Sequence, residues 1–256
     1  MAVAQAGIAL RLPRPIEDPA ALVCALFGDA VEELDRPTSA GFDIRQRGDV
    51  MLQTFGDVCF VCNLDFGCRV IDDPHAESER LHAAFGGPEF LMAYCHDEVN
   101  ERYGYAVYAR GRPIRARMQS LSARDPGDRT NRLVRTAPPT TLRESGNPLS
   151  FERRWLGAAH FLQHVDDPAQ PTTRIFYLGD REVLVPESRL TGRLLQDGLS
   201  ALFGVCPWNT LITPRYRFFR LRGPSAQPTP AAREDAVAPW WRAWWKSRAP
   251  GLASRS

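Results

Sequence analysis

Residues 51–64 decide the fold: Met51-Leu52-Gln53-Thr54-Phe55-Gly56-Asp57-Val58-Cys59-Phe60-Val61-Cys62-Asn63-Leu64. Two largely apolar runs flank a Gly56-Asp57 turn, which predicts a β-hairpin. The second run has no polar residue from Val58 to Cys62, a pattern typical of a strand that is buried on both faces. We therefore expect a central, covered strand here.

Further hairpins are predicted on both sides of this one. Gly111 lies in a turn between strands at 103–108 and 113–118, and Gly179-Asp180 separates strands at 173–178 and 182–185. Single strands are expected at 89–95 and 216–221. Hairpins with few helices between them predict an α+β fold with a mainly antiparallel sheet and a few packed helices.

Capping signals and apolar periodicity predict four helices. Asp18-Pro19 begins the first, which ends at Gly28, and Asp73-Pro74 begins the second, which ends near Phe85. The other two are expected at 151–164, capped by Ser150, and at 187–203. Residues 119–149 lack periodicity, so we expect a long loop or a junction there.

The 256 residues are predicted to form one α+β domain over residues 1–222, with any junction within 119–149, followed by a flexible tail over 223–256. Hydrophobic residues make up 44% of the chain and charged residues 24%, which excludes a wholly disordered protein. No apolar run is long enough to predict a membrane-spanning helix.

Charge is divided unevenly along an arginine-rich chain, in which Lys246 is the only lysine. Residues 1–101 hold 7 arginines and 18 acidic residues, whereas residues 102–154 hold 12 arginines and 4 acidic residues. In the basic segment, Arg110, Arg112, Arg115 and Arg117 follow three tyrosines, a combination that binds single-stranded nucleic acid when it shares a sheet face. One hypothesis is therefore a nucleic-acid binder through 102–154. The alternative is that this segment faces the acidic first hundred residues of the same fold.

Two histidine groups are candidate metal ligands. On a helix, His75, Glu79 and His82 would project from one face, and two imidazoles with one carboxylate suit Zn²⁺ or Fe(II). His160 and His164 form a second pair, one helical turn apart if residues 151–164 are helical. These residues predict a divalent metal, and with it a metal-dependent hydrolase or oxygenase, as the alternative function. The alternative to both metal sites is an exposed helix face that binds nothing.

The six cysteines are not expected to form disulfides, because residues 1–13 do not resemble a signal peptide. The chain is predicted to be cytoplasmic, with Cys59, Cys62 and Cys95 as reduced thiols in the sheet interior.

The tail carries the most unusual composition in the chain. Four of its residues, Trp240, Trp241, Trp244 and Trp245, would share one face of a helix, with Arg242 and Lys246 nearby. Such a face suits docking into a partner protein's groove or contact with a membrane surface. The alternative is that the tail covers apolar surface of its own chain.

One further sequence pattern begins with a strand, a charged turn and a basic strand at Gly104–Arg115. It continues with the segment Gly146-Asn147-Pro148-Leu149-Ser150-Phe151-Glu152. This segment, 104–152, resembles a family of stand-alone bacterial proteins to which no activity is assigned. The resemblance implies no catalytic residue and no cofactor.

These observations favour a cytoplasmic, non-enzymatic binding or accessory protein, such as a neutralising partner of another bacterial protein, peripheral at a membrane if the tail contacts lipid. No cofactor is expected under this interpretation. This interpretation rests on the charge pattern and the aromatic tail. It also rests on the absence of sequence motifs for phosphate loops, dinucleotide binding, serine hydrolysis and zinc proteolysis.

Deleting residues 224–256 should leave the fold intact, because the tail has too little aliphatic content to form a core. The melting temperature and the binding to vesicles or a partner, compared between the full-length and truncated proteins, test this. A large loss of stability without loss of binding would favour a tail that covers its own chain.

Overall fold

A computed structural model describes residues 4–12, 15–35, 41–121, 140–164, 172–179 and 181–223. Its centre is a nine-stranded sheet in the order β2-β12-β3-β4-β1-β5-β6-β7-β8, in which every neighbouring pair is antiparallel. The strands are β1 Ala4–Arg11, β2 Ala30–Leu34, β3 Asp49–Phe55, β4 Val58–Cys62, β5 Phe90–Asp97, β6 Arg102–Ala109, β7 Arg112–Leu121, β8 Thr140–Gly146 and β12 Arg215–Arg222.

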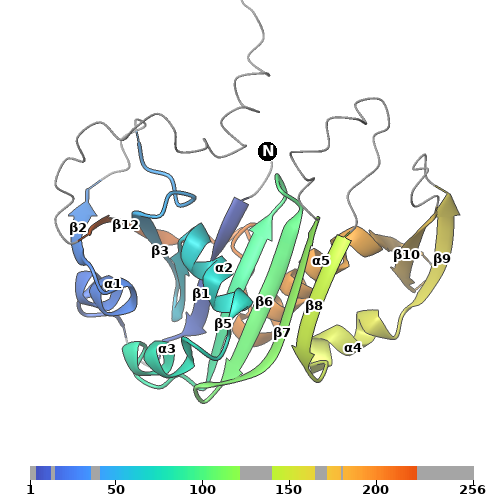
Figure 1. Cartoon of the computed structure of the whole chain (residues 1–256), viewed down its shortest axis with the longest axis horizontal. Helices are drawn as coiled ribbons and strands as arrows, with labels where there is room; N and C mark the ends of the chain where they lie inside the picture. Colours follow the sequence, from blue (N-terminus) through green and yellow to red (C-terminus); the bar gives the residue numbers. More distant parts are fainter. Residues whose placement is uncertain are drawn as a thin grey trace, which may run out of the picture. The chain divides into compact units, whose positions relative to one another are not determined.

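Helices cover both faces of this sheet (Figure 1). Three helices pack on one face: α1 Pro19–Phe27, α2 Leu64–Asp72 and α3 Ser78–Ala84. On the other face lie α4 Ser150–Leu156 and α5 Leu190–Phe203, the latter preceded by the short 3₁₀ helix η1 Glu187–Arg189. Because β4 is central and covered on both sides, all five of its residues are buried. This confirms the expectation for the Val58–Cys62 run and the α+β class.

A smaller antiparallel sheet has the order β11-β10-β9. Its strands are β9 Ala159–His164, β10 Thr172–Leu178 and β11 Val183–Pro186. Phe176 of β10 and Val185 of β11 join the apolar cluster beneath α4 and α5. The small sheet therefore packs on the side of the large sheet opposite α1, α2 and α3.

Two glycines allow α2 to lie against β1. A Cβ atom on Gly67 of α2 would lie 2.4 Å from the backbone nitrogen of Gly7 in β1, and a Cβ on Gly7 would lie 1.9 Å from the carbonyl oxygen of Val61 in β4. Neither space can hold a side chain. Helix and sheet backbones are thus in direct contact at this point.

Several sequence predictions are confirmed. Asp18 caps α1 by accepting a hydrogen bond from Ala21 N, and Gly28 ends the helix with a left-handed backbone. The hairpins β3–β4, β6–β7 and β10–β11 form as expected, as do β5, β12 and the helix at 190–203.

Other predictions were wrong, mostly where pairing partners are distant in sequence. The expected helix at 74–85 begins only at Ser78, and the expected helix at 151–164 ends at Leu156, after which residues 159–164 form β9. Within the expected loop at 119–149, β7 continues to Leu121 and β8 pairs with it. The elements that were not predicted are β1, β2, β8, β9 and α2.

All described residues belong to one compact unit that ends at Gly223. The predicted tail lies outside the described residues, except for Gly223. Its four tryptophans, Trp240, Trp241, Trp244 and Trp245, stay candidate docking residues on the sequence alone. Among the described helices, none is long and apolar enough to cross a membrane.

Replacing Gly67 with alanine should destabilise the fold by roughly 1–3 kcal/mol, because the added methyl group forces α2 away from β1. Urea unfolding measures this change. The matched control is Gly48→Ala, where a Cβ has no atom within 4 Å. Equal stabilities of the two variants would contradict the backbone contact.

Candidate functional site

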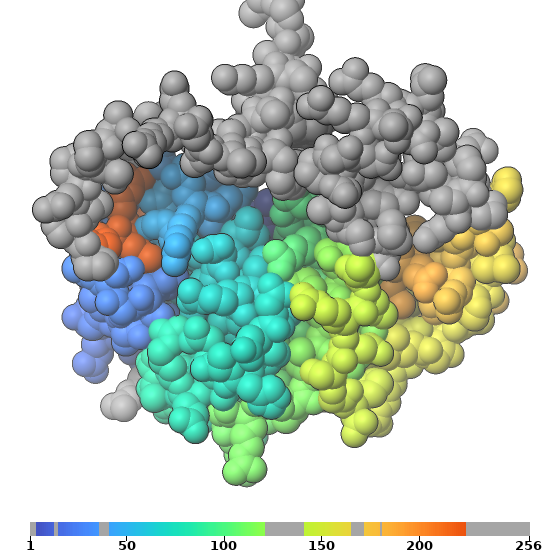
Figure 2. All heavy atoms as spheres, viewed as in Figure 1, coloured from blue at the N-terminus to red at the C-terminus, as the bar shows by residue number. Residues whose placement is uncertain are grey.

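A hollow of about 520 Å³ lies between α3 and the β6–β7 turn. Two groups of candidate residues that are distant in the sequence line this hollow together: the predicted metal ligands His75, Glu79 and His82, and the two arginines Arg110 and Arg112. Its lining residues are His75, Ser78, Glu79, His82, Ala83, Arg110, Gly111, Arg112 and Pro113. In the space-filling view, the tip of the β6–β7 hairpin projects at the lower edge of the molecule, next to α3 (Figure 2).

The turn before α3 explains why His75 is not on the helix. The Asp73 carboxylate accepts a hydrogen bond from Ala76 N at 3.2 Å, and Ser78 Oγ donates to the carbonyl oxygen of His75 at 3.0 Å. The predicted cap therefore closes a turn, and α3 starts at Ser78. The single helix face proposed for His75, Glu79 and His82 does not form, although all three line the same hollow.

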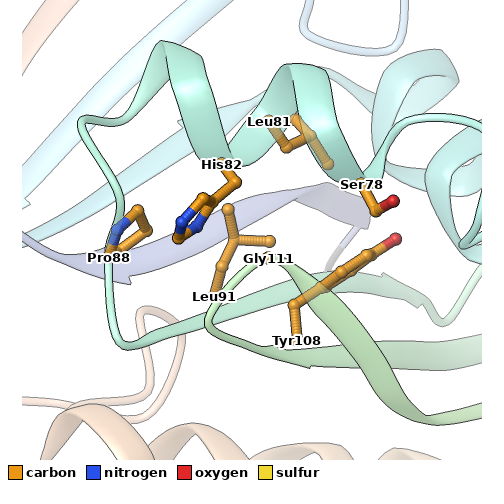
Figure 3. Close-up of a pocket in the computed structure, with 7 residues that line it drawn as sticks. All are labelled: Ser78, Leu81, His82, Pro88, Leu91, Tyr108 and Gly111. Atoms are coloured by element: carbon orange, nitrogen blue, oxygen red, sulfur yellow. The ribbon is translucent and has the colours of Figure 1, made fainter.

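The β6–β7 turn requires a glycine facing His82. Arg110 and Gly111 both have a left-handed backbone, with φ of 48° and 76°. A Cβ on Gly111 would lie 2.8 Å from Cγ of His82, so a side chain there would displace the imidazole. Figure 3 shows the His82 ring beside Pro88 and Leu91 in a second, smaller pocket, which shares Ser78, His82 and Gly111 with the hollow and is also lined by Leu81 and Tyr108.

The ionisable side chains of the hollow have no partners among the described residues. No hydrogen bond or ion pair within that part of the chain involves the side chains of His75, Glu79, His82, Arg110 or Arg112. Both arginines are exposed. Arg80, on α3 itself, is different, because it pairs with Glu77 at 2.6 Å. The hollow therefore presents two free guanidinium groups beside two imidazoles and one carboxylate.

Arg115 and Arg117 share one strand face, as expected, but they point into the core. Their exposed fractions are 3% and 5%. Arg115 binds Glu152 of α4 at 2.9 Å and Glu144 of β8 at 2.9 Å, and donates to the carbonyl oxygen of Gly146 at 3.0 Å. Arg117 binds Glu144 at 2.6 Å. These two arginines are therefore excluded from the nucleic-acid surface suggested by the sequence.

The Arg115 network also fixes α4. Glu152 is fully buried, and its carboxylate accepts hydrogen bonds from Tyr105 Oη at 2.6 Å and from Leu149 N at 2.6 Å. Burial and the Glu152 carboxylate together raise the pKa of Tyr105 well above its usual value. Burial opposes the charge on Arg115, but the hydrogen bonds that it donates to Glu152 and Glu144 outweigh burial and raise the pKa of Arg115. The sequence alone does not predict that Glu152 is the buried countercharge of Arg115, because no local pattern links the two residues.

The second histidine pair lies on an exposed strand. His160 and His164 belong to β9, where residues four apart share a face but are about 13 Å from each other. They cannot bind one metal ion together, so the helical geometry assumed for this pair was wrong. They also lie on the side of the large sheet opposite His75 and His82. The described residues contain no group of three or more His, Cys, Asp or Glu side chains suited to a metal ion.

Cys59, Cys62 and Cys95 lie in the sheet interior, as predicted. Cys59, Cys62 and Cys95 are fully buried, and all six cysteines are free thiols. Burial raises the pKa of Cys59 to about 12 and that of Cys62 to about 11. These two thiols are therefore protonated core residues near neutral pH.

No family model, curated protein or solved structure matches this chain. The resemblance of residues 104–152 to a bacterial family stays a prediction.

Replacing Glu152 with glutamine should destabilise the protein by about 3 kcal/mol, because it removes the buried countercharge of Arg115. Glu144→Gln is the matched control, since Glu144 binds the same guanidinium but is 46% exposed and should cost about 1 kcal/mol or less. Urea unfolding of both variants tests the difference. Similar losses would show that burial does not set the strength of the pair.

Proposed function

We propose that this protein is a non-enzymatic binding protein that recognises an acidic segment of another protein at the hollow between α3 and the β6–β7 turn. The observation that carries the proposal is the contrast along β7. Arg115 and Arg117 are neutralised inside the fold, whereas Arg110 and Arg112 reach solvent with no partner in the described residues.

The chemistry of the hollow suits carboxylates. A guanidinium group presents a planar set of N–H donors that matches a carboxylate in a two-point contact. The imidazoles of His75 and His82 add donors on the opposite wall. Glu79 repels an anion on its side, so a bound carboxylate should lie toward Arg110 and Arg112 and away from Glu79.

Apolar groups beside the turn favour a protein partner. Pro113 lines the hollow, and Ile114, which follows it on β7, is 37% exposed. Exposed apolar side chains next to arginine are typical of protein interfaces. A nucleic acid would need a basic track for several phosphates. Here the track ends after Arg112, because the next two arginines of β7 are buried.

Replacing both Arg110 and Arg112 with glutamine should weaken the binding of a short poly-glutamate peptide by about 2- to 30-fold, since each exposed charge pair contributes about 0.2–1 kcal/mol. Calorimetric titration at low and high salt measures this, with tighter binding expected at low salt. The matched control replaces Arg153 and Arg154 of α4 with glutamine, since both are exposed and have no ion pair among the described residues.

An equal loss of peptide binding in the two double variants would mean that only net charge matters, and it would contradict a site at the hollow. A single-stranded oligonucleotide is titrated in parallel. Tighter binding of the oligonucleotide, lost with Arg110 and Arg112, would replace the acidic protein with a nucleic acid as the partner.

A further inference from the structure

Two thiols from distant parts of the chain meet under α2. Cys68 of α2 and Cys95 of β5 have their Sγ atoms 3.3 Å apart. The close contact of Gly67 with Gly7 seats α2 on β1, and Ala6 of β1 lies opposite Cys95 in the sheet register. The fold thus holds the pair together, although 27 positions separate the two residues in the sequence.

The two thiols differ in access and in their charged surroundings. Cys68 is 7% exposed, whereas Cys95 is fully buried. The hydrogen bond between the thiols is the largest influence on the pKa of Cys68 and lowers it. Burial and the negative charges of Asp72 and Asp97 raise this pKa, while the positive charge of Arg102 lowers it. The net result is a lowered pKa for Cys68. The same hydrogen bond and burial raise the pKa of Cys95 well above its usual value. Cys68 is therefore the more nucleophilic thiol, and it is the one nearer to solvent.

We propose that Cys68 and Cys95 are a redox-active dithiol that hydrogen peroxide converts into a disulfide. The Cys68 thiolate attacks one peroxide oxygen and breaks the O–O bond, which gives a sulfenic acid and a hydroxide ion. The Cys95 sulfur then attacks the Cys68 sulfur, forms the S–S bond and displaces the sulfenic hydroxyl group. The Cys95 proton leaves with that hydroxyl group as water. The hydroxide ion takes up the proton that Cys68 lost on ionisation, so two electrons pass from the sulfurs to the peroxide, which ends as two molecules of water.

The structure needs little change to reach the disulfide. An S–S bond is about 2.05 Å long, so the sulfurs must approach by about 1.2 Å, a movement that small side-chain rotations can supply. The bond would fasten α2 to β5. The other buried thiols are Cys59, Cys62 and Cys206, and none of them makes a hydrogen bond to another thiol in the described part of the chain. Cys59 and Cys62 lie three positions apart on β4, where they face opposite sides of the sheet.

The test is peptide mapping of the full-length protein after peroxide treatment, denaturation and alkylation. Before alkylation, the intact mass should fall by about 2 Da through the loss of two hydrogens, and dithiothreitol should reverse the change. Trypsin should release a cross-linked pair of peptides, 48–69 and 81–102. The first contains Cys59, Cys62 and Cys68, so fragmentation must assign the bond to Cys68.

Variants separate this pair from general cysteine oxidation. Cys24→Ser, at the one cysteine that is not buried, should still form the disulfide. Cys68→Ser should not form it, and Cys95→Ser should accumulate a sulfenic acid on Cys68 that dimedone labels. If either pair variant fails to fold, the wild-type peptide map decides alone. A bond between any other two cysteines, or an unchanged Cys68–Cys95 pair after peroxide treatment, would overturn the proposal.

Discussion

The buried ion pair between Arg115 and Glu152 is the interaction on which one whole side of the fold depends. Placing a guanidinium group in a protein core is costly unless hydrogen bonds and an opposite charge compensate it. Glu152, Glu144 and two backbone carbonyl oxygens supply that compensation for Arg115. The hydroxyl group of Tyr105 donates a further hydrogen bond to the Glu152 carboxylate. Because these groups come from β6, β7, β8 and α4, the pair fixes where α4 lies on the sheet.

The same interaction decides which arginines of the β6–β7 hairpin stay exposed. Along β7 the arginines alternate with other residues, and the sheet pleat sends Arg115 and Arg117 toward α4 and α5. Arg110 and Arg112 lie at the hairpin tip, beyond the reach of the buried carboxylates. The tip meets α3 through the contact of His82 with Gly111, so the free cations come to share a hollow with the histidines of a distant segment.

On the opposite face, a backbone contact between α2 and β1 adds to the packing of apolar side chains. Gly67 lets α2 approach β1 so closely that the residue after it, Cys68, reaches β5 and meets Cys95. Both faces bury an apolar cluster, to which the α4 side adds a satisfied charge network and the α2 side adds a glycine-mediated backbone contact. The contact of His82 with Gly111 forms the surface hollow, and the contact of Gly67 with Gly7 brings the two thiols together.

The sequence by itself determined the elements whose signals are local. The unbroken apolar run Val58–Cys62 required a covered strand, Gly56 and Gly111 located turns, and the periodic leucines of 190–203 specified a helix. Tertiary structure alone decided the rest. The residues of β8 and β9 become strands because β7 and β10 pair with them, and His160 and His164 lose their helical spacing as a result. Likewise, nothing local distinguishes Arg112 from Arg115. The difference is a carboxylate 37 residues away, and only folding brings that charge to one arginine and leaves the other in water.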